Sequence, residues 1–315
     1  MRCPQLYSYQ HVLRLFGLDA IEGAPEMEED TTALTRGTLG HQGLAQHYQR
    51  LRDKQDGRDP DRWLLPSDAI RAKAAAEGGT WPDHATVAVP TVEAYLRGTA
   101  RERLRVLGVE MELLAVLQHG TAVAPHTQKA DLVLVGEDDR VYVWDHKFCA
   151  RIWPNVLERY AVSGQFLGYE VLGRRIWGDR WSGVRLNLVA WADRDGRGKW
   201  ERKALPPAPW ALRAWEGEVV AAWQAVGAFL DAGLDPWHWR KKLSEYVCKG
   251  PYKACLGQAY CQTGPAAGEA AKLAATLAVE AARERYAAAI AEARRWQAIA
   301  AACSGVAAWT AETFP

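Results

Sequence analysis

The feature that most constrains this chain is a pair of short apolar runs separated by turn-forming residues. Residues 132–135 and 141–144 are rich in Val and Leu, and G-E-D-D at 136–139 lies between them. Short β-branched runs bounded by Gly and Asp are typical of a β-hairpin. Asp131 precedes the first run, and D-H-K at 145–147 follows the second. The sequence therefore predicts a hairpin that carries two acids and a lysine at one end.

Strand geometry predicts how these polar side chains are arranged. Successive side chains of a strand point to opposite faces, so Asp145 and Lys147 share a face. Asp131 begins the neighbouring strand and is expected beside them. Two carboxylates and a lysine on one face suit a hard divalent cation and an activated water. The alternative is a solvated hairpin with surface acids, because this spacing also occurs by chance.

Three further segments carry polar residues in a suggestive order. His41 lies in G-T-L-G-H-Q-G-L at 37–44, which opens a helical stretch to about residue 51. Glu110 and Glu112 lie two residues apart on a predicted strand, so the pattern does not separate them. Gln165 and Tyr169 are one helical turn apart on one face. The alternatives are a surface histidine and an amphipathic helix with Tyr169 in its core.

Taken together, these motifs resemble the PD-(D/E)XK nuclease superfamily, and within it the RecB-like branch that includes the CRISPR-adaptation nucleases. The resemblance implies a restriction-endonuclease-like α/β core. It also implies that Asp131 and Asp145 bind Mg²⁺ or Mn²⁺ together with the backbone carbonyl of His146, and that Lys147 orients the attacking water. Further implied site residues are His41 and one of Glu110 or Glu112 as additional ligands, with Gln165 and Tyr169 supporting the site and the nucleic-acid strand.

The cysteines suggest a second metal site. Cys3 lies near the N-terminus, and three more cluster far downstream at Cys248, Cys255 and Cys261. The resemblance implies that these four thiolates ligate a [4Fe–4S] cluster, as in the iron–sulfur nucleases of this branch. The first gap in the downstream trio is longer than the commonest family spacing, which leaves a four-cysteine Zn²⁺ site open. Three buried free cysteines are the other alternative, and Cys149 and Cys303 are interpreted as ordinary apolar positions.

Composition fits a cytoplasmic protein rather than a secreted or membrane one. The chain has 315 residues, of which 49% are hydrophobic and 24% charged. No apolar leader or membrane-length run is evident. The net charge of +1 is not that of a strongly basic DNA binder, so contacts with DNA are expected from local patches such as the Arg- and Trp-rich residues 174–203. Most of the 15 tryptophans are nevertheless expected in the core.

The chain is predicted to be α/β, with a small mixed central sheet flanked by helices. Two domains are expected: a nuclease domain over 1–265, closed by the cysteine cluster, and an Ala-rich extension over 266–315. Residues 269–302 are expected to form one long helix or a helical pair. Residues 19–36 are interpreted as a loop. Strands are expected near 108–117, 131–136, 140–148, 185–191 and 199–203, and helices near 4–18, 41–51, 73–77, 91–97, 155–173 and 206–232.

The function expected from the resemblance is a DNA exonuclease of phage or recombination and repair type that leaves a 5′-phosphate and a 3′-hydroxyl. Its partners would be DNA and a recombination or CRISPR-adaptation protein. One alternative is a CRISPR-adaptation nuclease, and another is a non-catalytic nucleic-acid-binding module. The retained acids and lysine count against the binding module. An iron–sulfur redox protein lacks support, because no flavin or nucleotide motif is present.

Overall fold

The protein is described here from a computed structural model. It covers residues 32–192 and 198–231, with isolated positions between 284 and 295; the side chains of residues 159, 226 and 229–231 are not described. The chain forms two compact units. One comprises Met1–Glu28, Val116–Pro125 and Glu216–Gly305, and the other Glu29–Ala115, His126–Trp215 and Val306–Pro315. The predicted domain boundary at 265/266 lies outside the described residues.

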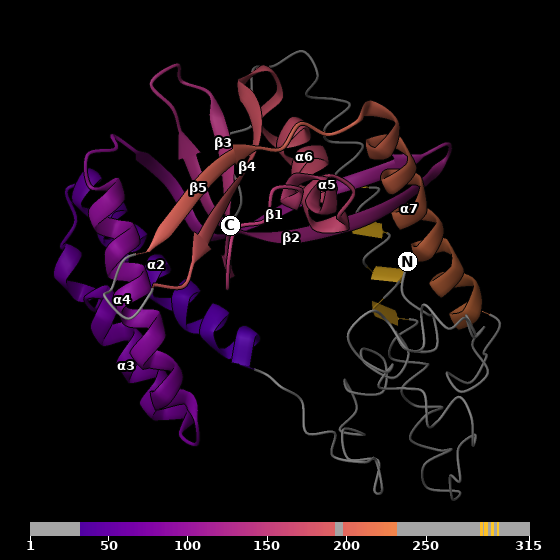
Figure 1. Cartoon of the computed structure of the whole chain (residues 1–315). Coiled ribbons are helices and arrows are strands. Elements are labelled where there is room, and N and C mark those ends of the chain that lie inside the picture. Colours follow the sequence, from indigo (N-terminus) through magenta and orange to yellow (C-terminus); the bar gives the residue numbers. More distant parts are fainter. Residues whose placement is uncertain are drawn as a thin grey trace, which may run out of the picture. The chain divides into compact units, whose positions relative to one another are not determined.

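The described part is built on a five-stranded sheet in the order β1-β2-β3-β4-β5 (Figure 1). Strand β2 runs antiparallel to β3, β3 parallel to β4, and β4 antiparallel to β5. The predicted hairpin is β2 and β3, and the small mixed sheet is confirmed. The strands are Arg105–His119, Ala122–Val135, Val141–Cys149, Trp181–Ala190 and Lys199–Ala204.

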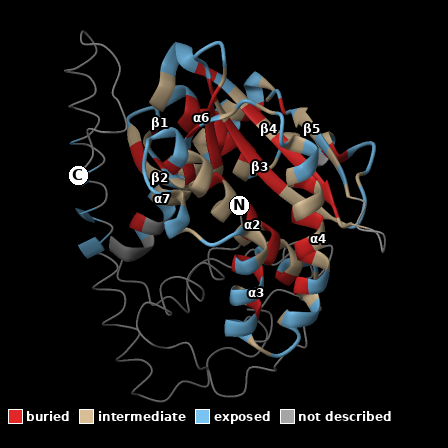
Figure 2. Ribbon diagram, turned by 90° about the vertical axis from the view of Figure 1, so that its left-hand side faces the viewer, coloured by how far each residue is buried: buried red, intermediate tan, exposed pale blue. Residues whose placement is uncertain are grey.

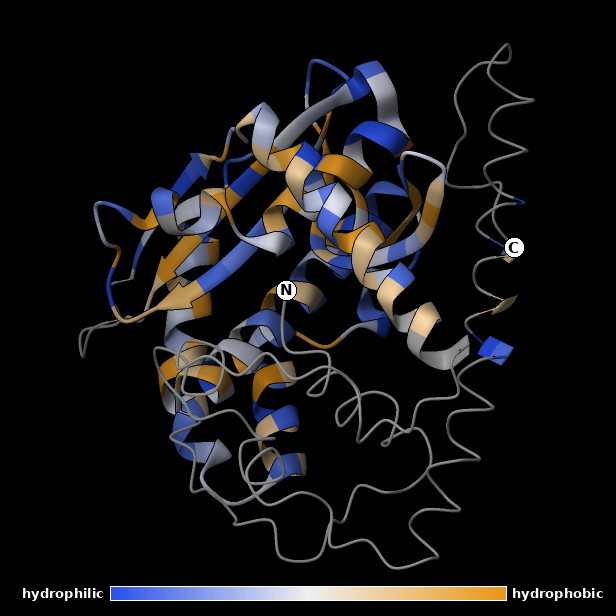
Figure 3. Ribbon diagram, turned by 90° about the vertical axis from the view of Figure 1, so that its right-hand side faces the viewer, coloured by the Kyte–Doolittle hydropathy of each residue, from blue (hydrophilic) through white to orange (hydrophobic). Residues whose placement is uncertain are grey.

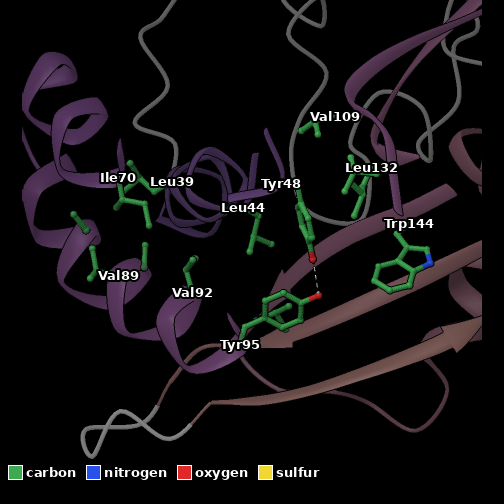
Figure 4. Close-up of a cluster of buried hydrophobic side chains, with 14 of the residues drawn as sticks. Leu39, Leu44, Tyr48, Ile70, Val89, Val92, Tyr95, Val109, Leu132 and Trp144 are labelled. Carbon is green, nitrogen blue, oxygen red and sulfur yellow. Dashed lines mark hydrogen bonds between the residues drawn. The ribbon is translucent and has the colours of Figure 1, made fainter. Parts of the chain in front are cut away.

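Helices cover both faces of the sheet in the second unit. One hydrophobic cluster joins helices α2, α3 and α4 to Leu132, Leu134 and Trp144 (Figure 4). A second joins α5 and α6 to Val133 and Val143 on the opposite face. The buried residues accordingly lie along the strands and the inner helix faces (Figure 2). The helices are Thr32–Gln55 (α2), Pro66–Glu77 (α3), Trp81–Thr99 (α4), Val156–Ala161 (α5), Gly164–Trp177 (α6) and Pro209–Asp231 (α7).

Local sequence explains several helix ends. Pro66 starts α3, where a missing N–H costs nothing, and Gly78 ends it with a φ of +69° while its N–H bonds to the Ala74 carbonyl. Gly178, with a φ of +52°, ends α6 in the same way. Short 3₁₀ turns occupy Pro60–Arg62 (η3) and Gly178–Arg180 (η4). Pro66, Gly78 and Gly178 thus determine where α3 begins and where α3 and α6 end.

The structure corrects several expected boundaries. Strand β2 begins at Ala122, so Asp131 lies inside this strand and not at its beginning. Helix α2 begins at Thr32, so the loop predicted for 19–36 is wrong from that residue onward. The predicted helix at 155–173 is two helices, divided at Val162 and Ser163. Helix α4 starts ten residues earlier than expected and contains Pro90, because its packed face outweighs the local cost of the proline. The predicted helix at 4–18 lies outside the described residues, and within 269–302 only isolated helical positions are described.

No helix in the described ranges combines the length and apolarity that a membrane span requires. Hydrophilic positions are distributed over the helices and strands (Figure 3).

Candidate functional site

Asp131 lies where the regular pairing of β2 with β3 ends. The register runs from Val135↔Val141 to Leu132↔Trp144, and Asp131 is the next residue. Its Oδ2 accepts a hydrogen bond of 2.8 Å from the backbone N–H of His146. The carboxylate thus takes the place of a backbone acceptor and is fixed against the strand that carries Asp145 and Lys147.

Helix α2 brings His41 to this carboxylate. The Nδ1 of His41 lies 3.3 Å from Oδ2 of Asp131, and its ring contacts Phe148 edge-on, with centroids 5.5 Å apart. Gly40 permits this approach, because a Cβ at that position would collide with the Phe148 ring. Gly40 is therefore what lets α2 lie close to β3.

Glu110 completes a group of three potential ligands. Ligand atoms of His41, Glu110 and Asp131 all lie within 4.8 Å of one another, and this is a grouping suited to a metal ion. Glu110 has a φ of +50°, so the alternation of β1 is interrupted at that residue. Glu112, which the pattern had placed on the same face, is exposed and is not in the group.

Lys147 belongs to a second cluster, made with helix α6. Its Nζ lies 2.5 Å from Oδ1 of Asp145 and donates to Oε1 of Gln165 at 3.1 Å. The Nε2 of Gln165 donates to Oδ2 of Asp145 and to the Tyr169 hydroxyl, both at 2.9 Å. Tyr169 donates to the Lys129 carbonyl at 2.8 Å. The structure therefore brings together the acid, lysine, glutamine and tyrosine that the sequence had singled out.

A family model of the PD-(D/E)XK nuclease superfamily matches residues 1–312. The chain belongs to this superfamily. No curated protein matches it. Among solved structures, the crystal structure of SSO0001 matches with 13% identity and a TM-score of 0.31, covering 82% of this chain and 95% of that one.

Membership of the PD-(D/E)XK superfamily fits the observed sheet and suggests a nuclease that uses divalent metal ions. The sheet is mixed and flanked by helices, as in a restriction-endonuclease-like core. A nuclease superfamily also implies a nucleic-acid substrate. The group of His41, Glu110 and Asp131 is the candidate metal site of such an enzyme.

In this PD-(D/E)XK chain the pKa of Asp145 is raised and that of Asp131 is lowered. Burial raises the pKa of Asp145, and the neighbouring Asp131 raises it further against the opposing effect of Lys147, to about 6. Burial also acts to raise the pKa of Asp131, but hydrogen bonds from His146 and the proximity of His41 outweigh it and lower the pKa to about 2. Burial lowers the pKa of His41, which keeps its imidazole neutral and able to bind a metal.

Two other predictions concern the Arg- and Trp-rich residues 174–203 and the cysteine cluster. The tryptophans of the Arg- and Trp-rich stretch are partly or fully buried: Trp181 is in the core and stacks on Trp177 with centroids 5.6 Å apart. Two of its arginines, Arg174 and Arg180, are engaged in ion pairs with acids of the same unit. Cys3, Cys248, Cys255 and Cys261 lie outside the described residues, so the cluster stays a prediction.

Several residues around the site were not predicted from the sequence. Lys129 pairs with Glu110, its Nζ 2.6 Å from Oε2. Tyr48, Tyr95 and Asn187 surround the buried side chain of His146. Strand alternation places Lys129 on the face of Asp131, two residues later, and could have suggested it. No local pattern identifies Tyr48, Tyr95 and Asn187, because they come from separate elements.

Proposed function

We propose that this protein is a RecB-like, divalent-metal-dependent DNA nuclease that removes nucleotides from DNA ends. The observation that supports this most directly is the grouping of His41, Glu110 and Asp131 within 4.8 Å, next to the ion pair of Asp145 and Lys147. The exonuclease assignment rests on the sequence resemblance, and the sequence shows no base-reading motif such as a zinc finger or a helix-turn-helix. Recognition would then depend on phosphate contacts and be independent of base sequence.

The donor set fits Mg²⁺ or Mn²⁺. Carboxylate oxygens are the ligands these hard ions prefer, and one imidazole is compatible with Mn²⁺. Asp131, Glu110 and His41 would hold the ion, with Asp145 and the His146 backbone carbonyl completing the site. A bound ion would offset charge on the phosphate oxygens and lower the pKa of a water molecule.

The protein's own groups would orient the reactants. Lys147 is held between Asp145 and Gln165, with 24% of its side chain exposed, so its ammonium group can donate to a water or phosphate oxygen. The water oxygen would form a bond to phosphorus and the P–O3′ bond would break. The leaving oxygen would take up a proton, giving the 5′-phosphate and 3′-hydroxyl that the resemblance implies.

The deciding experiment is digestion of end-labelled linear DNA and covalently closed single-stranded circles, with Mg²⁺, with Mn²⁺ and with EDTA. We expect metal-dependent loss of the linear substrate and intact circles. Rapid cleavage of circles would replace the exonuclease by an endonuclease. Binding of DNA without any cleavage would favour the non-catalytic module. Dependence on a recombination or CRISPR-adaptation protein would show in the same assay as stimulation by that partner.

We also propose that Cys3, Cys248, Cys255 and Cys261 hold a [4Fe–4S] cluster, on sequence grounds alone. Protein purified without oxygen should be brown and contain about four Fe per chain. Cys3→Ser should release the metal and lower the melting temperature, since binding contributes to folding. Colourless protein with stoichiometric Zn²⁺ would indicate the four-cysteine zinc site instead, and Cys149→Ser is the matched control.

A further inference from the structure

A row of three polar side chains crosses the sheet behind the candidate site. His146 of β3 lies opposite Asn187 of β4, and Asn187 lies opposite Arg202 of β5. His146 and Asn187 are buried, and Arg202 is mostly so. They share the face of the sheet that the helices α2 and α4 cover with apolar residues. Polar groups in such a layer are costly unless they are hydrogen-bonded.

Tyr95 of helix α4 joins this row together. Its hydroxyl accepts hydrogen bonds from Nδ2 of Asn187 at 2.7 Å and from Nη2 of Arg202 at 3.4 Å. It also lies 3.1 Å from the hydroxyl of Tyr48 (Figure 4). A phenol offers two lone pairs and one hydrogen. Because the two nitrogen donors use the lone pairs, the hydrogen of Tyr95 is directed at Tyr48.

Arg202, at the β5 end of the row, is held in place by an ion pair. Arg202 donates to both carboxylate oxygens of Glu102, at 2.9 and 3.1 Å. A bidentate pair of this kind holds the guanidinium in one plane. The orientation of the Tyr95 ring is therefore determined from Glu102 through Arg202, and from Asn187 on the neighbouring strand.

The same two tyrosine rings enclose His146. The centroid of its ring lies 5.7 Å from that of Tyr48 and 6.1 Å from that of Tyr95. On its other side, His146 contacts Asp131 through its backbone N–H at 2.8 Å, and its Nδ1 lies 3.7 Å from the same carboxylate oxygen. Ring packing alone would require only a phenylalanine at 95. The three polar contacts of the hydroxyl instead fix where the ring lies.

We propose that Tyr95 is a positioning residue for the candidate metal site: its hydrogen-bonded hydroxyl fixes the ring that holds His146, and His146 in turn holds the Asp131 carboxylate in its ligand orientation. This inference rests on the proposed function, in which Asp131 binds the metal ion. Tyr95 packs against the imidazole of His146 and touches none of the proposed ligand atoms, so its effect should appear in metal affinity rather than in DNA affinity.

The test compares Tyr95→Phe with Thr91→Val. Thr91 lies one turn earlier on α4 and is also a buried hydroxyl, which donates to the Val87 carbonyl and accepts from the Ala192 N–H. Both substitutions remove a buried hydrogen-bonding hydroxyl from one helix, but only Tyr95 contacts His146. Mn²⁺ binding to the full-length protein is measured by electron paramagnetic resonance, and cleavage is measured as kcat and KM against Mn²⁺ concentration.

We expect Tyr95→Phe to weaken Mn²⁺ binding about tenfold, the low end of the range for residues that orient metal ligands. Thr91→Val should bind Mn²⁺ like the wild type even if both variants lose similar thermal stability. The KM for DNA at saturating Mn²⁺ should be the same in all three proteins. In a His146→Leu background, Tyr95→Phe should have no further effect on Mn²⁺ binding, because the imidazole that Tyr95 positions is gone.

Two outcomes are distinguishable. If the wild type binds Mn²⁺ and Tyr95→Phe binds it equally well, or if Thr91→Val weakens binding by the same factor, Tyr95 is a structural residue and the inference is wrong. If the wild type neither binds Mn²⁺ nor cleaves DNA with it, the proposed function fails, and the positioning role that depends on it fails as well.

Discussion

Among the described residues, Asp53 and Asp145 have carboxylates without solvent-exposed surface, and their surroundings differ sharply. Asp53, near the end of α2, accepts hydrogen bonds of 2.6 Å from both Nε1 of Trp63 and Nε of Arg62. Arg58 approaches its other oxygen to 3.3 Å. Burial acts to raise the pKa of Asp53, but the hydrogen bonds from Trp63 and Arg62 outweigh it and hold the pKa below its ordinary value.

Asp145 likewise has no exposed surface, but less positive charge lies around it. It has one cationic partner, Lys147, and accepts a hydrogen bond from Gln165 at 2.9 Å, while the Tyr169 hydroxyl lies 3.3 Å from its Oδ2. Asp131 places a second negative charge nearby, and together with burial it raises the pKa of Asp145 to about 6. The same functional group is therefore stabilised as an anion at one position and destabilised at the other.

The difference fits a structural role for Asp53 and the metal-binding role that we propose for Asp145. Asp53 holds the η3 segment against the end of α2, and the positive charges of Arg58 and Arg62 stabilise its carboxylate. The pair of Asp145 and Asp131 is short of positive charge in the protein alone, and a divalent cation would supply it. Perturbed pKa values of this kind concentrate at functional sites, because binding groups are arranged for the ligand rather than for the free protein.

The largest expected effect is on cleavage by Asp145→Asn. The amide keeps the shape of the side chain but removes the charge that a metal ion requires. We expect metal-dependent cleavage of linear DNA to fall at least about a hundredfold, the scale for losing one charge-stabilising group in an active site. Asp131→Asn should do the same.

Asp139→Asn is the matched control for that substitution. Asp139 lies in the turn of the same hairpin, is exposed, and pairs with Arg180 at 3.0 Å. Its φ of +58° suits asparagine equally well. The cleavage rate of Asp139→Asn should equal that of the wild type. An Asp145→Asn protein that cleaved DNA at the wild-type rate would remove Asp145 from the site.

The second expected effect is on stability, by Asp53→Asn. The change leaves Arg58 and Arg62 without their shared anion and should lower the melting temperature clearly, while the rate per folded molecule stays that of the wild type. Asp56→Asn is the control, because Asp56 also pairs with Arg58 but is about half exposed. Surface pairs contribute at most about 1 kcal/mol, so this variant should melt close to the wild type. Equal losses in both variants would contradict the central role of Asp53.

Much of this arrangement could be predicted from the sequence, since it depends on short-range patterns. The hairpin follows from two apolar runs around G-E-D-D, and strand alternation placed Asp145 with Lys147. Helical spacing placed Gln165 and Tyr169 on one face, and both contact Asp145.

What the sequence could not supply depends on contacts between distant elements. Glu110 could not be separated from Glu112, because the positive φ that reorients Glu110 has no glycine or asparagine to mark it. The environment of Asp53 comes from Arg58, Arg62 and Trp63 folding back on the helix end, which no periodicity encodes. Tyr95 and Asn187 are 92 residues apart and meet only in the folded sheet.

The smallest expected effect is a pH dependence of stability in the metal-free protein. An aspartate in the unfolded chain has a pKa of about 3.9, whereas that of Asp145 in the folded protein is about 6. Between these values the folded state binds a proton that the unfolded state does not. Asp145 therefore lowers the free energy of unfolding as pH rises from about 4 to about 6. Asp131, with a pKa of about 2, acts in the opposite direction and at lower pH, roughly 2 to 4.

The difference between Asp145→Asn and the wild type isolates this contribution. The pKa of His41 is lowered by burial, so in the wild type it favours folding as pH rises and partly masks Asp145. Both proteins contain that histidine, and subtraction largely removes its effect. In EDTA, Asp145→Asn should be more stable than the wild type by about 1–3 kcal/mol at pH 8, from a shift of about two pKa units. The advantage should shrink towards zero at pH 4, as urea unfolding at each pH would show. A wild type that is more stable than Asp145→Asn at pH 8 would mean that Lys147 and Gln165 already satisfy the carboxylate, and the contrast with Asp53 would disappear.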